Sequence, residues 1–292
     1  MSWLLGQSPQ QGSAAGRRKR PLRPLRTKPW RMKWRMKQLP AKPKRNPSRM
    51  LLEYLQQPIV HAGTGEIAGV ELLARFDGQP PAGILGDRAS GWLALDLGGL
   101  SHIRDGDLRG RQGAVFVNLS RHVVRYEWAT DTFLQVCRRA QDQCLTRIVV
   151  EIDEETDLPD PGMSALAQRV RATGLLCAMD DHRGSPFCYR RSDLGCWDFI
   201  KVCSRNRPIE SACKDIQILA ATGVPVVAEA IETQSARIAA ESAGASYIQG
   251  WHTGYPEPVW TDSIADAFLT EGDLSRQISG MISRNLAQVW AG

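Results

Sequence analysis

The sequence predicts an α/β protein whose strands form a closed (β/α)8-type barrel. Eight short apolar runs follow one another between residues 56 and 250, and stretches with helical character separate most of them. Nearly continuous apolar strands that alternate with helices are typical of a parallel sheet covered by helices. Eight strands in roughly 240 residues fit a closed barrel better than an open doubly wound sheet, because no glycine-rich phosphate loop follows any strand.

The expected strands are the apolar runs of five to eight residues at 56–62, 69–76, 114–120, 147–153, 175–181, 198–203, 224–230 and 246–250. Their apolar character predicts strands that are buried between the barrel interior and a layer of helices. The stretches at 126–143, 162–173, 210–221 and 234–243 are expected to be the helices of that layer. Residues 50–270 are therefore expected to form one barrel domain, and residues 271–292 a C-terminal helix.

The basic residues are concentrated at one end of the chain. Residues 1–50 contain 15 Lys or Arg and no acidic residue, whereas residues 51–292 contain 22 basic and 31 acidic residues, a net charge of −9. High charge and several prolines predict that residues 1–49 are a disordered arm. The arm has two interpretations. It is a polyanion-binding segment, in which Trp30 and Trp34 could stack on bases or sit in a membrane interface. Alternatively, it is a solvated tail, or a stretch upstream of a true start at Met32, Met36 or Met50.

The seven cysteines are odd in number and form no CxxC pair. The sequence also lacks a signal-peptide pattern and a long apolar run. These observations predict reduced thiols in a cytoplasmic protein without a transmembrane segment, a disulfide framework or a structural zinc site.

Polar side chains follow the apolar strands, most conspicuously in the stretch AMDDHRG at residues 178–184. In a barrel the carboxyl ends of the strands converge on one mouth, where such enzymes place their chemistry. The residues expected at or near this mouth are Glu71, Asn118, Glu151, Glu154, Asp180, Asp181, Lys201, Glu229, Glu232 and Gln249.

So many carboxylates in a small volume require cations to hold them. Oxygen donors without convergent His or Cys select hard ions, which here means Mg²⁺ or Mn²⁺. The adjacent carboxylates Asp180 and Asp181 could serve two ions about 3.5–4 Å apart, the spacing used for in-line attack on phosphate. Lys201 would offset charge on the phosphoryl oxygens or orient the attacking water.

Residues 50–270 resemble the EAL domain, the bacterial phosphodiesterase module for the second messenger cyclic di-GMP. The stretch YLQQPIV resembles the opening segment of the family, and ELLAR stands where its EAL-x-R signature is expected. The motifs VNLS, EIDE, DD, KV, AEAIET and QGWHTGYP then follow in the family order. The resemblance implies a modified (β/α)8 TIM-type barrel and a two-metal reaction in which water attacks phosphorus, a ribose 3′ oxygen leaves, and linear pGpG is formed.

The resemblance also implies a role for each matching residue. Glu71, Asn118, Glu151 and Asp180 match ligands of a first metal ion, and Asp181 and Glu229 match groups around a second. Lys201 matches the lysine near the attacking water, and Glu154 the glutamate that braces the loop after the two aspartates. The positions that match substrate contacts or supporting groups are Gln57, Arg75, Glu232 and Gln249.

The chain departs from the family pattern in the loop after the two aspartates. Arg183 and Ser185 replace glycines of that loop, which couples to dimerisation in the family, and Pro186 stiffens it. Cys203 replaces an aspartate, and a thiol is a poor substitute for a carboxylate at a hard metal ion. A further change, to Ala230 from glycine, is expected to be mild.

Three functions are consistent with this pattern. The first is a metal-dependent cyclic di-GMP phosphodiesterase that forms a homodimer and has reduced activity. The second is a weak or inactive EAL-like module that binds cyclic di-GMP or a protein partner. The third interpretation, a nucleic-acid-associated protein acting through the basic arm, has the least support.

Overall fold

A computed structural model describes residues 50–105, 113–144, 146–259 and 268–269. The chain divides into two units, Met1–Lys44 and Arg45–Gly292, and all of the described residues belong to the second. The expected arm at residues 1–49 and the expected helix at residues 271–292 lie outside the described residues.

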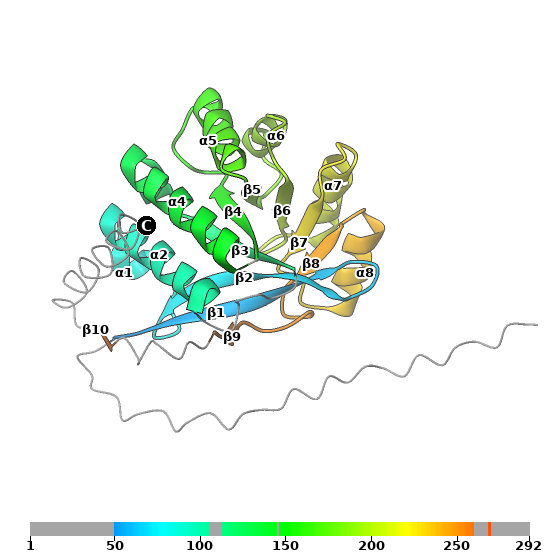
Figure 1. Ribbon diagram of the computed structural model, residues 1–292. Helices are drawn as coiled ribbons and strands as arrows, with labels where there is room; N and C mark the ends of the chain where they lie inside the picture. The colour runs from blue at the N-terminus through cyan, green and yellow to red at the C-terminus, as the bar shows by residue number, and fades with distance from the viewer. Residues whose placement is uncertain (1–49, 106–112, 145, 260–267, 270–292) are drawn as a thin grey trace, which may run out of the picture. The chain divides into compact units, whose positions relative to one another are not determined.

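The strands and helices alternate through most of this unit (Figure 1). The strands are β1 (Met50–His61), β2 (Ile67–Phe76), β3 (Ala114–Leu119), β4 (Arg147–Asp153), β5 (Leu176–His182), β6 (Phe199–Cys203), β7 (Val226–Glu229), β8 (Tyr247–Gln249), β9 (Glu257–Pro258) and β10 (Phe268–Leu269). The helices are α1 (Ala82–Leu85), α2 (Ala89–Asp105), α3 (Arg121–Val124), α4 (Glu127–Cys144), α5 (Asp160–Ala172), α6 (Pro186–Ser192), α7 (Ile209–Ala220) and α8 (Gln234–Ser242).

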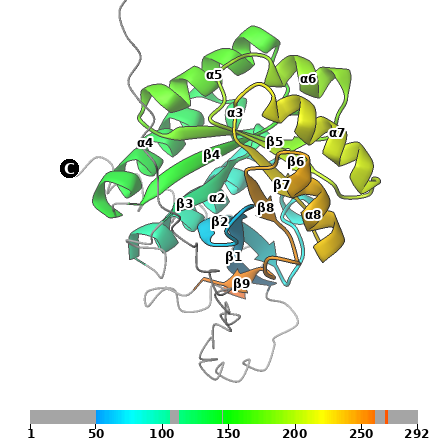
Figure 2. The ribbon, with the colours of Figure 1, turned by 90° about the vertical axis from the view of Figure 1, so that its right-hand side faces the viewer.

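The sheet closes on itself. Strands β2 to β8 pair in sequence order and are parallel, and β8 pairs back onto β1. Helices α4 to α8 lie outside the ring of strands (Figure 2). The expected α/β barrel is therefore confirmed, and its eight principal strands overlap the eight expected runs.

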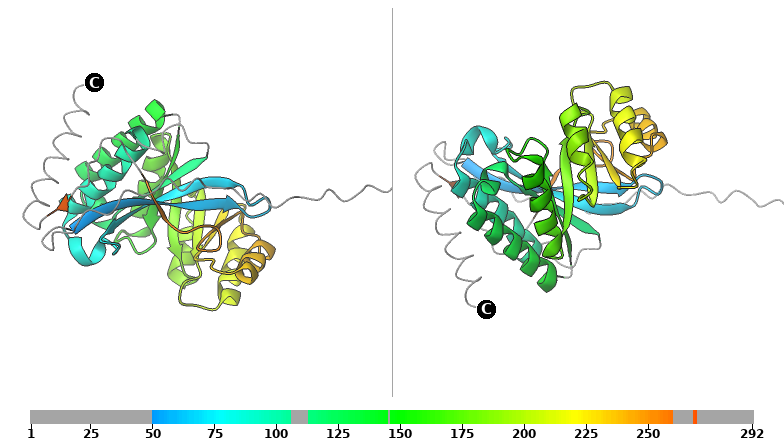
Figure 3. Two further views of the ribbon diagram at one scale, coloured as in Figure 1. Left: turned by 90° about the horizontal axis from the view of Figure 1, so that it is seen from below. Right: turned by 90° about the horizontal axis from the view of Figure 1, so that it is seen from above.

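The first strand corrects the expectation of a uniformly parallel sheet, because β1 is antiparallel to both β2 and β8. Only residues 62–66 separate β1 from β2, and a parallel crossover needs a dozen or more residues. The two strands instead form a long hairpin (Figure 3). This departure makes the barrel a modified (β/α)8 fold.

Pro58 lies within β1, at a position that has no pairing partner on the edge of the strand facing β8 and β9. Its missing N–H therefore costs no hydrogen bond on that edge. There β9 pairs with residues 55–56 and β8 with residues 59–61, so residues 57 and 58 fall between the two partners. Proline is tolerated in a strand at such an interruption. Gly254 packs closely against the ring of Pro58, since a Cβ on this glycine would lie 2.5 Å from Pro58 Cγ.

Two apolar clusters hold the barrel together. The larger one lies between the strands and the helices. The smaller one fills the barrel interior with residues from five different strands: Ile59, Phe116, Val149, Ala178 and Val227. The interior is thus a packed core, and any binding site has to lie at one of its ends.

The cysteines and the helices agree with the sequence analysis. All seven cysteines are free thiols, so the prediction that they form no disulfide is confirmed. In the described part of the chain, none of the helices is both long enough and apolar enough to span a bilayer.

Candidate active site at the barrel mouth

Strand alternation places polar side chains directly above the interior cluster. Side chains two residues apart on a strand point to the same face. On β4, for example, Val149 belongs to the interior cluster, and Glu151 therefore faces the barrel axis at the next level. The same step leads to polar residues on the other strands: Gln57, Asn118, Asp180, Lys201, Glu229 and Gln249.

A β-bulge lies at the two adjacent aspartates. In the β5–β6 pairing, Met179 is opposite Ile200 and His182 is opposite Val202. Two residues of β5, Asp180 and Asp181, therefore stand opposite one residue of β6, Lys201. Asp181 has a φ of 59°, in the left-handed region that costs energy for a residue with a Cβ. The bulge re-aims the chain where the strand ends, as bulges next to active sites do.

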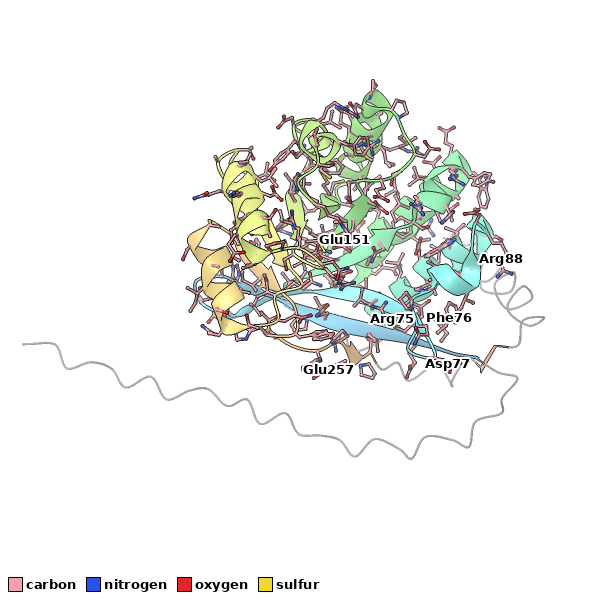
Figure 4. The ribbon with its side chains drawn as sticks, turned by 180° about the vertical axis from the view of Figure 1, so that it is seen from behind. Arg75, Phe76, Asp77, Arg88, Glu151 and Glu257 are labelled. Carbon is pink, nitrogen blue, oxygen red and sulfur yellow. The ribbon has the colours of Figure 1, made fainter. Side chains whose placement is uncertain are left out.

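One ammonium group holds four carboxylates. Nζ of Lys201 lies 2.5 Å from Glu151 Oε1, 2.9 Å from Asp180 Oδ1, 3.0 Å from Glu229 Oε1 and 3.3 Å from Glu71 Oε2. We call these five residues the carboxylate cluster. Its members come from five strands and are largely buried, and Figure 4 shows Glu151 among the strands. Five of the predicted site residues are thus brought together.

Gln249 and Gln57 extend the carboxylate cluster toward β1. Nε2 of Gln249 donates hydrogen bonds to Glu71 Oε2 and, at 3.3 Å, to Gln57 Oε1. Gln57 in turn donates through Nε2 to the carbonyl oxygen of Gly254, also at 3.3 Å. Two further predicted residues therefore belong to the same connected site.

Burial of like charges changes the protonation of the carboxylate cluster. Burial, reinforced by the charge of Glu71, raises the pKa of Glu151 well above its ordinary range. Burial likewise raises the pKa of Asp180 to about 6 and that of Glu229 to about 8, although Lys201 opposes both shifts. Burial alone would lower the pKa of Lys201, but the surrounding carboxylates hold it above its usual value. The lysine is thus charged and the carboxylates compete for it.

The donor set fits a hard divalent cation. As the described side chains stand, no group of three or more His, Cys, Asp or Glu is arranged to hold a metal ion, since the carboxylates converge on Lys201. That ammonium does not satisfy them all: Glu151 Oε2 is buried and has no hydrogen-bond partner among the described residues. Four carboxylates facing one positive charge leave an excess of negative charge, and oxygen-only donors select ions such as Mg²⁺ or Mn²⁺.

Several solved structures share this architecture. The Bacillus subtilis YkuI protein, solved with cyclic di-GMP and calcium, is 18% identical with a TM-score of 0.59, covering 82% of this chain and 63% of YkuI. The EAL domain of Pseudomonas aeruginosa FimX, bound to cyclic di-GMP, is 20% identical with a TM-score of 0.56, covering 70% of this chain and 90% of that domain. The chain has the EAL fold.

A third solved structure with this fold is longer than the present chain, and two sequence comparisons find no match. The EAL enzyme Bd1971, solved with cAMP and cyclic di-GMP, is 17% identical with a TM-score of 0.56, covering 79% of this chain. This chain spans 64% of the length of Bd1971. No protein-family profile matches the sequence, and a comparison with curated proteins finds no match. The shared fold and the geometry of the site therefore carry the functional argument.

The remaining predicted residues lie around the carboxylate cluster without joining it. Asn118 is opposite Glu151 in the β3–β4 register, but its side chain is exposed. Arg75 lies further along β2 (Figure 4) and donates to the carbonyl oxygen of Ala74 at 2.7 Å. Glu232 is exposed in the segment after β7. Asn118 and Arg75 are carried by strands of the barrel, and Glu232 by the segment that follows β7.

Glu154 is buried behind the loop that the EAL pattern expects it to brace. Only 3% of it is exposed, and burial together with the charge of Asp153 raises its pKa to about 9. Its Oε2 has no hydrogen-bond partner among the described residues. Glu154 is thus a buried acid next to this loop.

The loop after the two aspartates has one residue in the left-handed region of backbone conformation. Gly184 alone within residues 182–186 has a positive φ, of 77°, and it is a glycine. Ser185 has a φ of −73° and caps α6, because its Oγ accepts a hydrogen bond from the amide nitrogen of Cys188. Neither Arg183 nor Ser185 therefore has a positive φ in this conformation of the loop.

A network centred on Asp215 braces this loop, and the sequence analysis missed it. Asp215 on α7 accepts hydrogen bonds from Tyr189 Oη at 2.5 Å and from Arg207 Nη1. Arg207 also donates through Nε to the carbonyl oxygen of Cys203 at 2.7 Å. Gly184 packs against the same carboxylate, since a Cβ on it would lie 2.5 Å from Asp215 Oδ2. No sequence signal marks Asp215, which reads as an ordinary polar residue of a helix.

Cys203 ends β6 beside the carboxylate cluster. It is opposite Glu229 in the β6–β7 register and only 5% exposed. Burial, followed by the charge of Glu229, raises the pKa of its thiol to about 12. The thiol is therefore neutral, which agrees with its expected weakness as a substitute for a carboxylate.

Ala230 is a less mild change than the sequence suggests. Its φ is 57°, in the region where glycine is favoured and alanine is strained. The conformation is held in place by Ser204, whose Oγ donates to the carbonyl oxygens of Glu229 and Ala230.

Proposed function

We propose that this chain is an EAL-type phosphodiesterase that hydrolyses cyclic di-GMP to linear pGpG. The observation that carries the proposal is the carboxylate cluster: four carboxylates from four separate strands face one buried lysine at the mouth of an EAL-fold barrel. Such a constellation costs stability in the free protein, because buried like charges repel one another. Perturbed carboxylates at a barrel mouth point to function.

Each member of the carboxylate cluster has a proposed role. Glu71, Glu151 and Asp180, together with Asn118, would hold one Mg²⁺ or Mn²⁺ ion. The two residues proposed for a second ion are Asp181 and Glu229. Bound cations would polarise the phosphodiester and lower the pKa of an attacking water.

The proposed role of Lys201 follows from its burial. Its ammonium lies within 3.3 Å of all four carboxylates, so it holds them in place before any cation binds. With the carboxylates engaged by cations, the ammonium is free to donate hydrogen bonds to the attacking water or to a phosphoryl oxygen. Glu154, buried behind the loop after β5, would brace that loop.

Substrate contacts are proposed for polar residues at the rim. Gln57 and Gln249, which are hydrogen-bonded to each other, present amide groups suited to the edge of a guanine base. Arg75 would pair with a phosphate, and Glu232 would support the segment after β7. The FimX and YkuI structures were both solved with cyclic di-GMP bound, which supports the substrate class. Divalent cation dependence has support from the calcium bound in YkuI.

A second candidate function is a cyclic di-GMP receptor with little or no turnover. Cys203 favours it, because a neutral buried thiol stands where the EAL pattern has a carboxylate. Homodimerisation and polyanion binding by residues 1–49 remain predictions.

The test is incubation of the purified full-length protein with cyclic di-GMP and Mg²⁺ or Mn²⁺, following both binding and pGpG release. We expect pGpG to form, and we expect EDTA, Glu71→Ala and Asp180→Ala each to abolish its formation. Asp142→Ala, on the exposed face of α4, is the matched control and should turn over like wild type. Binding without turnover would establish the receptor function, and undiminished turnover in the Glu71 or Asp180 variant would exclude the metal mechanism.

A further inference from the structure

The loop after β5 carries a cation of its own. Nη2 of Arg183 lies 3.2 Å from Asp181 Oδ2, and the two side chains are about half exposed, at 50% and 44%. The bulge in β5 places Asp181 next to Asp180 of the carboxylate cluster. The guanidinium therefore sits at the edge of the proposed cation site.

The two parts of the site balance their charge differently. Glu71, Glu151 and Asp180 share the single ammonium of Lys201 with a fourth carboxylate, and Glu151 Oε2 is left without a partner. This part retains excess negative charge. Asp181, in contrast, has a guanidinium to itself.

Cys203 further reduces the negative charge on the Asp181 side. It follows Lys201 by two residues on β6 and lies opposite Glu229 in the register. Its thiol is soft and uncharged, so it contributes little to a hard divalent cation. Glu229 itself is bonded to Lys201 at 3.0 Å. Around the second cation position, Cys203 is therefore neutral, and Asp181 and Glu229 are already paired with positive groups.

We propose that Arg183 controls the affinity of the second cation position. Its guanidinium stays paired with the carboxylate of Asp181 until a second divalent cation displaces it. The second cation therefore binds more weakly than the first. The inference rests on the proposed function for its expectation of two cations.

Two physical terms set the size of the effect. A second cation has to break the Arg183–Asp181 pair, which is weak because it is exposed. It also meets the positive guanidinium at close range, a repulsion that solvent only partly screens. Together these terms predict that neutralising Arg183 strengthens second-cation binding on the order of tenfold while leaving the first affinity unchanged.

The test is calorimetric and electron-paramagnetic titration of the metal-free full-length protein with Mn²⁺ alone. The variants are Arg183→Gln, which removes the charge, and Arg183→Lys, which keeps it. Arg190→Gln is the matched control, because Arg190 on α6 is a similarly exposed arginine whose Nε lies 2.6 Å from Oδ2 of Asp160 on α5.

We expect wild type to bind one Mn²⁺ tightly and a second at least about tenfold more weakly. Arg183→Gln should tighten only the second step, whereas Arg183→Lys and Arg190→Gln should behave like wild type. Two equal steps in wild type, or an unchanged second step in Arg183→Gln, would overturn the inference.

A parallel assay of cyclic di-GMP hydrolysis separates this inference from the proposed function. If the Mn²⁺ steps follow the expected pattern but cyclic di-GMP is neither bound nor cleaved, the proposed function fails and the role of Arg183 stands. If cyclic di-GMP is cleaved and the Mn²⁺ steps do not respond to Arg183→Gln, the role of Arg183 fails alone.

Discussion

Asp181 and Ala230 both have left-handed backbone conformations beside the carboxylate cluster, with φ values of 59° and 57°. Residues with a Cβ persist in this region only where their surroundings hold them, and such positions gather at functional sites. Asp181 is proposed as a cation ligand, so its carboxylate has a function that offsets the strain of its backbone. Ala230 presents no functional group, which makes its strain an unneeded cost.

Ala230→Gly should therefore stabilise the protein. Relief of the left-handed strain, offset in part by the greater entropy of glycine in the unfolded chain, predicts a gain of about 0.5–1 kcal/mol. Urea denaturation measures it. Ala228→Gly, at a buried position of β7 two residues earlier, is the control and should destabilise. A loss of stability at both positions would contradict the strain argument.

Cys203→Asp should raise turnover on the order of tenfold with little change in KM, because a carboxylate there would act mainly in the transition state. Steady-state pGpG release at saturating Mn²⁺ is the measurement. Cys203→Ser, a neutral replacement of similar size, should gain nothing. If Cys203→Asp also gains nothing, the missing carboxylate does not limit the reaction.

At the scale of elements, the loop after β5 depends on a helix that follows it in the chain. Asp215 on α7 binds Tyr189 of α6 and Arg207, and Gly184 of the loop packs against its carboxylate. These contacts join the loop after β5 to α6, α7 and the segment after β6. The glycine is required there twice, by its φ of 77° and by the carboxylate in front of it.

Gly184→Ala and Gly195→Ala separate these two requirements. Gly195 also has a positive φ, of 67°, but a Cβ on it would meet nothing within 4 Å. We expect Gly195→Ala to cost about 1 kcal/mol from strain alone, and Gly184→Ala about 2–3 kcal/mol because the methyl group also displaces Asp215. Chemical denaturation of both variants gives the comparison, and equal costs would show that the loop is not packed against α7.

For the whole molecule, the carboxylate cluster makes stability depend on pH and on cations. Burial raises the folded-state pKa of Glu229 from its ordinary 4.5 to about 8, so the folded state binds more protons there than the unfolded state does. That contribution is present at low pH and is lost as the pH rises through this interval. His182 has the opposite effect on stability, because burial lowers its pKa from 6.5 to about 4. Its contribution is complete above about pH 6.5 and is lost as the pH falls from there toward 4.

Metal-free protein should therefore lose stability between about pH 6.5 and pH 8, where the pH passes through the raised pKa of Glu229 and the contribution of His182 is already complete. Mn²⁺ replaces the protons and should raise Tm by more at pH 8 than at pH 5.5. Calorimetry in EDTA and in excess Mn²⁺ measures both effects. Glu229→Gln should flatten the metal-free profile, and an equal Mn²⁺ shift at both pH values would argue against cation binding by these carboxylates.

Local patterns in the sequence are sufficient to predict the barrel and the residues that lie at its mouth. Each strand is a local apolar run, and the period of two within a strand decides which side chains share the face of the interior cluster. Because parallel strands end at the same rim, the polar residues that follow those runs have to converge. The positions of Glu71, Glu151, Asp180, Lys201 and Glu229 needed no more than this.

The pairing of those residues and the strain at individual backbone positions depend instead on the folded structure. The direction of β1, the four partners of Lys201, the left-handed conformation of Ala230 and the packing of Gly184 against Asp215 all join segments that are distant in the sequence. A local pattern records which face a side chain occupies. Distances across the barrel and individual dihedral angles depend instead on register and packing, which the folded chain satisfies as a whole.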